Sequence, residues 1–470
     1  MAKLYVFAIG GTGSRVLKSL SFLLATGVKS NVSVIVPIII DPDVANGDLT
    51  RTVDILKSYQ LIRKELPHID NVDDSFFKTE IREISQNFKL NISSSDKKFK
   101  EYIDYSNLDP SNQALTSLLF SESNLESQMD VGFKGNPNIG SVVLNQFQNS
   151  DDFKNFQSSF EQGDKIFIIS SIFGGTGAAG FPLLLKNIRS ANQSSPNWAI
   201  LQNAPIGAIS VLPYFGVKPN EESNIDKSTF ISKTKAALGY YENNVTNGSI
   251  NNMYYLGDDI SKDYENVEGH SKQKNDAHFV ELISALSIID FMNQTDYSEN
   301  IVKEFGIERD TDSVTFTDLS DKTKNTIFKP LTQFFYFNLF LKNEFKKSYT
   351  LNYGRVSPVI DDSFFSSDFY SYIQQFNNYF SEWLSELKNN RRAFNPYELN
   401  PSNDNIFDYI NNITPKKDSF SLIGSSKNYN RFITELNKIK PNLGLTEINQ
   451  NFISLFYKAT NNLIKEKFNS

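Results

Sequence analysis

The first forty residues alternate between two patterns of apolar positions. Residues 4–9 and 32–40 are short, nearly continuous apolar runs, as is typical of parallel strands that are covered on both faces. Between them, from Ser14 onward, valine and leucine recur at helical spacing. A glycine-rich turn, Gly10–Gly13, separates the first run from this helix. The order strand, turn, helix, strand predicts a parallel sheet with helices packed outside it.

The same arrangement returns near the middle of the chain. Residues 165–172 form an apolar run, residues 174–180 contain four glycines, and a helical pattern continues through Ile188. We expect further strands at 204–212 and 253–256, a helix at 229–241, and a long apolar helix at 277–292. These elements predict an α/β fold with a Rossmann-like parallel sheet.

The character of the sequence changes after about residue 345, where aromatic residues and asparagines dominate. Residues 370–387 and 429–439 have helical spacing, and 420–423 is a fair strand. We therefore expect three parts: a nucleotide-binding type of domain over 1–292, a connecting segment over 293–350, and a mostly helical C-terminal domain over 351–470.

Composition narrows the possible functions. The 470 residues include no cysteine, which excludes thiol nucleophiles, thiolate zinc sites and disulfides. The net charge of -7 argues against a dedicated nucleic-acid binder. No apolar run approaches the ~20 residues that span a bilayer, and the first residues do not resemble a signal peptide. We expect a soluble, cytoplasmic protein without a membrane span.

Both glycine turns follow a strand and open a helix, and this is where phosphate binds in many proteins. Free N–H groups and the positive end of the helix dipole stabilise an anion there. Neither turn is a Walker A motif, and Val16 stands where a dinucleotide fingerprint has its third glycine. A plain tight turn is the alternative for each loop.

Residues 173–180, Phe-Gly-Gly-Thr-Gly-Ala-Ala-Gly, resemble the signature loop of the tubulin/FtsZ family. Phe173 stands for the first glycine of that loop, and the end reads Ala-Ala-Gly. Three more matches follow the family's order: residues 10–14 resemble its first phosphate loop, residues 135–140 its Gly-Ala-Asn-Pro loop, and residues 213–215 its Pro-Phe segment. The resemblance implies a GTPase domain, a long central helix at about 277–292, and a second domain.

The resemblance also implies ligands and site residues. GTP or GDP, with Mg²⁺, would be bound by these loop residues: Gly10, Gly11, Thr12, Gly13, Ser14, Gly135, Asn136, Gly174, Gly175, Thr176, Gly177 and Ala178. The base would meet Asp258, where the family has asparagine, and the start of the central helix at His278, Asn275 or Asp276. An aspartate can accept hydrogen bonds from guanine but cannot donate one. Glu221, Glu222 or Lys227 would reach the ribose.

Hydrolysis in the tubulin/FtsZ family is completed by an acidic residue from a neighbouring subunit. Asp318 and Asp321 are the candidates here, with Asp296 as an alternative. The resemblance thus implies slow GTP hydrolysis on self-association, into a homo-oligomer or a cytoskeletal filament, and it leaves room for protein partners. The region after 350 does not resemble the β-rich second domain of the family.

Two other functions stay open. The chain could be a tubulin-fold scaffold in a multi-protein bacterial system that binds nucleotide without hydrolysing it, because the family's acidic pattern is incomplete. It could also be an NAD-dependent oxidoreductase, with Asp41 at the end of the second strand on the ribose. The missing third glycine and the second glycine loop argue against the oxidoreductase.

Overall fold

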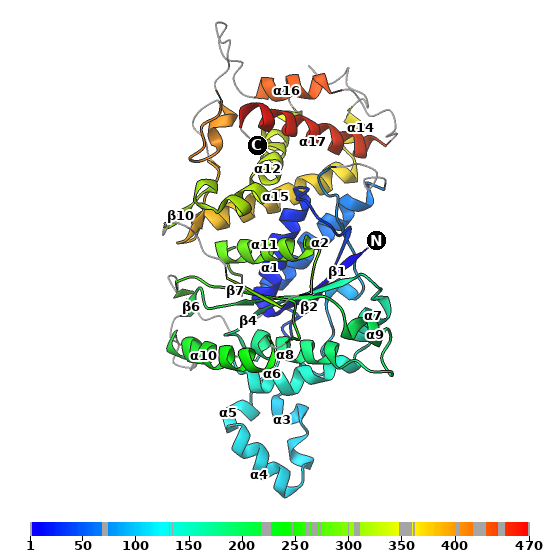
Figure 1. Cartoon of the computed structure of the whole chain (residues 1–470), viewed down its shortest axis with the longest axis vertical. Helices are drawn as coiled ribbons and strands as arrows, with labels where there is room; N and C mark the ends of the chain where they lie inside the picture. The colour runs from blue at the N-terminus through cyan, green and yellow to red at the C-terminus, as the bar shows by residue number, and fades with distance from the viewer. Residues whose placement is uncertain are drawn as a thin grey trace.

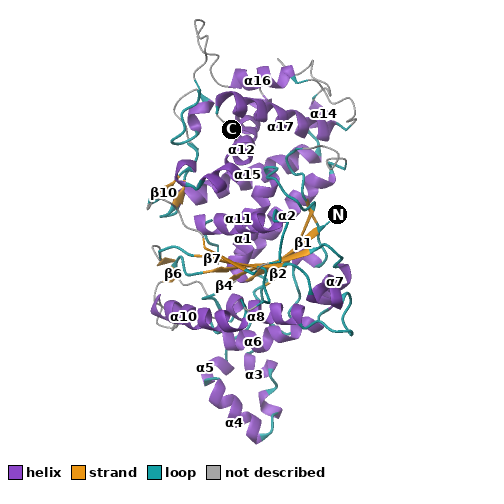
Figure 2. Ribbon diagram, in the orientation of Figure 1, coloured by secondary structure: helices purple, strands orange, loops and turns teal. Residues whose placement is uncertain are grey.

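The computed structural model describes residues 2–67, 74–130, 132–133, 135–217, 227–246, 248–259, 263–264, 271, 274–298, 300–304, 311–346, 360, 362–399, 405–416, 429–439 and 447–468. These residues form an elongated molecule with a parallel sheet near its middle (Figure 1). Helices dominate both sides of the sheet and the whole C-terminal part (Figure 2).

Strands from both halves of the first 304 residues form one parallel sheet with the order β3-β2-β1-β4-β5-β7-β9. Its strands are β1 (Lys3–Ile9), β2 (Val34–Ile40), β3 (Glu80–Ile81), β4 (Lys165–Ser171), β5 (Ile206–Val211), β7 (Asn252–Leu256) and β9 (Ile301–Glu304). The order reverses between β1 and β4, which is the topological switch point of an open α/β sheet. Two short pairs lie apart from it: β6 (Gly216–Val217) with β8 (Asp263–Tyr264), and β10 (Ser313–Val314) with β11 (Ala393–Phe394).

Helices cover both faces of this sheet (Figure 1). One face carries α1 (Gly10–Ala25), α2 (Gly47–Lys64) and α11 (Phe279–Met292). The other carries α6 (Pro137–Leu144), α7 (Asp151–Ser159), α8 (Gly175–Arg189), α9 (Trp198–Gln202) and α10 (Lys227–Asn244). Burial on both faces explains why β2 consists of seven apolar residues, all of them buried. The continuous apolar runs therefore reflect a doubly covered parallel sheet.

The C-terminal part is a stack of helices on the face that carries α1, α2 and α11 (Figure 1). It contains α12 (Asp321–Phe340), α14 (Asp362–Phe365), α15 (Asp368–Asn389), α16 (Tyr429–Lys438) and α17 (Ile448–Lys467). Phenylalanines hold it together: the rings of Phe340 and Phe432 stack with centroids 4.5 Å apart, and Phe337 meets Phe456 at 5.2 Å. The aromatic residues of this region thus form a packed core.

A small finger projects from the opposite end of the molecule. It consists of α3 (Phe99–Tyr102), α4 (Pro110–Leu119) and α5 (Glu122–Leu125), and α4 lies farthest from the sheet (Figure 1). No residue of α4 is buried. The finger lies in the chain between β3 and α6, within a segment that the sequence pattern leaves as polar helix and loop.

The architecture confirms the expected fold class: a Rossmann-like parallel sheet, a long central helix (α11), and a mostly helical C-terminal region. The expected strand at 420–423 lies outside the described residues. Strand β9 extends the sheet beyond residue 292, and the division into 1–292, 293–350 and 351–470 stays a prediction. In the described part of the chain, no helix is both long and apolar enough to span a membrane.

Candidate functional site

The two glycine turns lie side by side at the point where the strand order reverses. Strands β1 and β4 are parallel neighbours, so their carboxyl ends meet at the same edge of the sheet. Helix α1 begins there directly after β1, and α8 begins there after β4. The two helices then run on opposite faces of the sheet (Figure 1), so their first turns meet at the switch point, where open α/β sheets commonly bind ligands.

The three loops predicted from the sequence touch one another. A Cβ atom added to Gly10 would lie 3.5 Å from the Cβ of Thr176, so the first and second glycine turns are in contact. A Cβ added to Gly175 would lie 3.1 Å from the backbone nitrogens of both Gly135 and Asn136. The turns at 10–14, 135–140 and 174–180 therefore share one edge of the sheet.

Two of the glycines are required by helix packing alone. A Cβ on Gly13 would lie 2.6 Å from the backbone of Ala8, and one on Gly177 would lie 2.6 Å from the carbonyl oxygen of Ser171. Each glycine lets the first turn of its helix pack directly on the preceding strand. This packing keeps the N–H groups of both first turns close to the sheet edge.

The beginnings of α1 and α8 have the features of an anion site. Neither helix has a side chain capping its first turn among the described residues, and neither carries an acidic residue there. Their N-cap residues are Ile9 and Gly174, which offer no side-chain acceptor. The first-turn N–H groups of a helix have no partner within the helix, so two helix N-termini that converge without side-chain caps offer these donors to a ligand and add their dipoles. A phosphate group is suited to this arrangement.

The predicted loop residues differ in how far they are open to solvent. Half-buried positions are Gly11, Gly135, Asn136, Gly174, Thr176 and Ala178, whereas Gly10, Thr12, Gly13, Ser14, Gly175 and Gly177 are buried. The Asn136 side chain caps α6, accepting from the N–H groups of Asn138 and Ile139 at 3.1 and 3.4 Å. The Ser14 hydroxyl is enclosed, so it does not face a ligand in this conformation.

A buried charged cluster lies directly behind the first glycine turn. The Arg15 guanidinium donates to Glu281 at 2.5 Å, to Asp48 at 2.9 Å and to the Tyr214 hydroxyl at 2.9 Å. A more distant contact reaches the Thr12 hydroxyl at 3.3 Å. These bonds join α1, α2, α11 and the loop after β5.

The cluster extends to the C-terminal helices through Glu386 of α15. This carboxylate accepts from Lys18 at 2.9 Å, from Arg51 at 2.6 Å and from the backbone N–H of Ala277 at 2.9 Å. Arg51 also contacts Asp48 at 2.9 Å. The three cations, Arg15, Lys18 and Arg51, are thus matched by three carboxylates, Asp48, Glu281 and Glu386, so the cluster neutralises itself.

In this cluster, the attraction between opposite charges outweighs the effect of burial on the pKa values. Burial by itself would lower the pKa of Arg15, but Tyr214, Glu281 and Asp48 raise it well above its ordinary value. Burial would raise the pKa of Asp48, but Arg15 and Arg51 hold it below its usual range. Both groups stay charged at neutral pH, as a buried ion network requires.

The predicted base-contact residues at the start of the central helix have structural partners. His278 is the N-cap of α11, where its Nδ1 accepts from the N–H of Val280 at 3.0 Å and its ring packs on Tyr214 with centroids 4.9 Å apart. Burial lowers the pKa of His278, although Glu281 opposes the shift. Asn275 donates to Asp48 through its backbone at 3.0 Å and its side chain at 3.1 Å.

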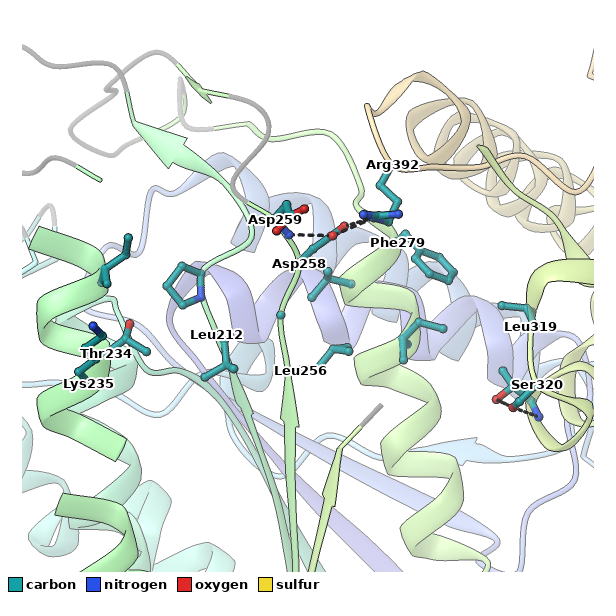
Figure 3. Close-up of a pocket in the computed structure, with 16 residues that line it drawn as sticks. Leu212, Thr234, Lys235, Leu256, Asp258, Asp259, Phe279, Leu319, Ser320 and Arg392 are labelled. Atoms are coloured by element: carbon teal, nitrogen blue, oxygen red, sulfur yellow. Dashed lines mark hydrogen bonds and ion pairs between the residues drawn. The ribbon is translucent and has the colours of Figure 1, made fainter. Parts of the chain in front are cut away.

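Asp258 lies in a different part of the same sheet edge, beside a pocket of about 820 Å³ (Figure 3). The pocket lies between the ends of β5 and β7, α10 and α11, and none of its lining residues comes from the three glycine loops. Arg392 Nε donates to both carboxylate oxygens of Asp258, at 2.8 and 2.6 Å. A guanine base at Asp258 would have to compete with Arg392 for the same oxygens.

The two acidic candidates for hydrolysis lie in contrasting settings. The buried Asp318 carboxylate accepts from the backbone N–H and the hydroxyl of Thr315, each at 2.8 Å, and so closes a short turn before α12. Asp321 is exposed in the first turn of α12. Asp296 is also on the surface, where it accepts from the N–H of Ser298 at 2.8 Å. A role for any of them in hydrolysis stays a prediction.

Part of the predicted site is not described. Glu221 and Glu222 lie outside the described residues, and of Lys227 only the helical backbone is described. Within the described part, no three histidine, aspartate or glutamate side chains gather as metal ligands.

The residues that sequence reasoning missed are the members of the charged cluster. Arg15 and Lys18 are spaced i, i+3 on a helix whose other positions are almost all apolar or small. Because nearly all other positions of this helix are apolar or small, the helix has no polar face to keep these two charges in water, and buried charges are normally paired. That spacing could have revealed buried cations, although not their partners, which come from positions 48, 281 and 386.

No protein-family model and no curated protein matches the chain. Among solved structures, CetZ2 from Haloferax volcanii, described as a GTPγS-bound protofilament, matches with 14% identity and a TM-score of 0.31. CetZ from Methanosaeta thermophila matches with 15% identity and a TM-score of 0.26. Each match covers 62% of this chain, and they span 58% and 52% of those structures, little more than half their length. At such low TM-scores the likeness carries no argument about function.

Proposed function

We propose that the chain is a tubulin/FtsZ-like protein that binds GTP or GDP at the junction of its three glycine loops. The observation that carries this proposal is the convergence of two uncapped helix N-termini, α1 and α8, at the switch point of a parallel sheet, with the 135–140 loop against them. Motif order adds support, because these three loops and residues 213–215 follow the order of the family. In this proposal the triphosphate lies along the first turns of α1 and α8.

The residues present fit a nucleotide with its metal ion. Mg²⁺ commonly keeps several waters and binds through phosphate oxygens, so it needs few protein ligands. Thr176 is half-buried at the junction of the three glycine loops. Its hydroxyl is our candidate to contact the phosphates or a metal-bound water. Mg²⁺ would there neutralise charge on the phosphates. The base would lie toward α11, beside the Arg15 cluster.

One substitution separates binding from folding. Thr176→Glu adds an acidic group to the first turn of α8, where it interacts favourably with the helix dipole but repels phosphate. We expect Thr176→Glu to fold and to lose at least tenfold in affinity for labelled GTP, a clearly larger loss than in the similarly shaped but neutral Thr176→Gln, which lacks only the threonine hydroxyl contact. Gly239→Ala, on an open stretch of α10, is the unrelated control. Equal binding by all variants, or no saturable binding of GTP by the wild type, would refute the proposal.

We further propose slow hydrolysis that is completed between subunits, in a homo-oligomer or a filament, with Asp321 as the better candidate because Asp318 is engaged in its own turn. Turnover per protein should then rise more than linearly with protein concentration. Asp321→Asn should lower turnover without changing GTP affinity. Binding with no turnover at any concentration would instead select the scaffold function.

The oxidoreductase hypothesis is disfavoured by the setting of Asp41. This residue is buried, one carboxylate oxygen accepts from the N–H of Asp43 at 3.1 Å, and burial raises its pKa to about 7. A ribose-binding carboxylate acts as a charged acceptor, which this environment disfavours. A fluorescence titration with NADH tests the alternative directly, and saturable binding of NADH but not GTP would establish it.

A further inference from the structure

Helix α4, at the tip of the finger, directs its apolar face toward solvent, which is the reverse of an ordinary surface helix. Leu115, Leu118 and Leu119 share one face by their i, i+3, i+4 spacing, and they are 54%, 85% and 62% exposed. All three lie open to solvent, although a leucine stripe of this kind normally faces a core. The finger thus presents a ready-made apolar surface of three adjacent leucines.

The opposite face of α4 is polar and turned inward. Its Ser117 hydroxyl bonds with the Tyr105 hydroxyl at 2.8 Å, and Gln113 Nε2 donates to the carbonyl of Tyr105 at 3.2 Å. Asp109 caps the helix by accepting from the N–H groups of Ser111 and Asn112 at 3.0 and 3.1 Å. These contacts fix the rotation of α4 about its axis, so the leucines are held outward.

The base of the finger is firmly built. Phe99 and Phe120 meet edge to face with centroids 4.8 Å apart. Lys98 pairs with Glu126 at 3.0 Å, and Lys100 pairs with the same carboxylate. A backbone bond from Phe99 to Ser127 at 2.9 Å closes the two ends of the segment. The tip is therefore a positioned surface, which lowers the ordering cost of binding a partner.

The segment of the finger that carries the leucines has charged residues of one sign only. Residues 101–126 contain five carboxylates, Glu101, Asp104, Asp109, Glu122 and Glu126, and no lysine, arginine or histidine. Two lysines neutralise Glu126, but the other four acidic residues lie on the exposed surface of the finger. An anionic membrane surface and nucleic acid are repelled by such a tip, and so is the same tip of a second copy.

We propose that the finger docks a protein partner that presents a cationic amphipathic helix: apolar residues against Leu115, Leu118 and Leu119, flanked by lysine or arginine. Packing such a helix along α4 covers the leucine stripe as a second helix does in any two-helix contact. The flanking cations are attracted by the exposed carboxylates of the finger, Asp104 and Glu122 among them, which favours a fast encounter. This surface lies on the opposite side of the sheet from the C-terminal helices (Figure 1), and the inference is independent of nucleotide binding.

The test uses the full chain and two synthetic helical peptides. Both carry leucines at i, i+3, i+4 and i+7; one has lysines at the flanking positions and the other has glutamates. Fluorescence anisotropy should show saturable binding of the lysine peptide and none of the glutamate peptide. Leu115→Ser/Leu118→Ser/Leu119→Ser should weaken binding at least tenfold, while Val302→Ser, a similarly exposed residue on β9, should not.

A charge variant tests whether the acidic residues of the finger attract the cationic partner helix. Asp104→Asn/Glu122→Gln keeps the leucines and should slow association several-fold at low salt, with the difference shrinking as salt rises. Equal binding of the lysine peptide to wild type and the triple leucine variant would overturn the proposal. So would a wild-type dimer in sedimentation analysis that the triple variant abolishes, because the stripe would then be covered by a second copy.

Discussion

Two segments of this protein reverse the usual division of apolar and polar residues, and they do so in opposite directions. The start of α1 buries Arg15 and Lys18 among apolar neighbours, whereas α4 exposes three leucines and turns its polar face toward Tyr105. In the first segment every buried charge has a partner from a distant part of the chain. In the second, no residue of α4 is buried. The first arrangement therefore holds the molecule together, and the second is available to something outside it.

The largest effect expected from this comparison comes from Arg15→Ala. Removing the guanidinium leaves Asp48 and Glu281 buried without their shared cation, and breaking a buried ion pair costs about 3–5 kcal/mol. We expect a corresponding loss in the free energy of unfolding, measured by urea denaturation. If the free energy of unfolding of Arg15→Ala stays within about 1 kcal/mol of wild type, the charged cluster does not stabilise the fold as described here.

Asp41 should give the next largest effect, and it should appear as a pH dependence. Its pKa is raised to about 7 in the folded protein, so the folded state holds a proton that the unfolded state releases between about pH 4 and 7. Stability should therefore fall as pH rises through this window, by up to about 4 kcal/mol for a shift of about 3 units.

Asp41→Asn removes that titration. Denaturation at pH 5 and pH 8 should show a smaller difference for Asp41→Asn than for wild type, with the variant more stable at pH 8. Asp54→Asn, at an exposed position of α2, serves as the control. An unchanged pH dependence in Asp41→Asn would show that the carboxyl is ionised in the folded state.

Asp109→Ala should have a local effect only. The carboxylate caps α4, and hydrogen bonds from the backbone of Asn112 and Ser111 hold its pKa below the usual range. Without a core to pack on, α4 depends on this cap and on the Tyr105 contacts. Amide hydrogen exchange in residues 110–119 should become faster, while the thermal midpoint of the whole protein stays the same.

The smallest effect on stability is expected for Leu118→Ser on α4. This side chain is 85% exposed and contributes little to the folded state, so the free energy of unfolding should change by less than about 0.5 kcal/mol. The same substitution in the core would cost several times more. A clear loss of stability would show that the leucine stripe packs within the molecule in solution.

The sequence was most informative where local pattern decides structure. The apolar runs predicted β1, β2, β4, β5 and β7, and the helical spacing predicted α1, α8, α10, α11, α15 and α16. The glycine turns after β1 and β4 were identified from their sequence, and they meet in the structure because these two strands are parallel neighbours that share an edge.

The features that could not be predicted from the sequence depend on contacts between residues far apart in the chain. Strand β9 is a short edge strand, Ile301–Glu304, and its four residues, two apolar and two charged, are too few to give a clear strand pattern. The pairing of Lys18 with Glu386 joins positions 368 apart, and no local pattern encodes such a partner. Asp258 was predicted to contact the base because it stands where the tubulin/FtsZ family has asparagine. The hydrogen bond that it accepts from Arg392 depends on the fold and could not be predicted from the sequence.

The junction of α1 with α15 has a consequence for how the chain can be divided. Phe22 packs against Phe376, Phe380 and Trp383, and Glu386 supplies the third negative charge beside Lys18 and Arg51. A truncated protein that ends before α15 would retain two cations in an apolar seam and expose a row of aromatic rings to water. We therefore expect the sheet-bearing half to be unstable when it is produced alone, unless substitutions along this junction replace the contacts that α15 supplies.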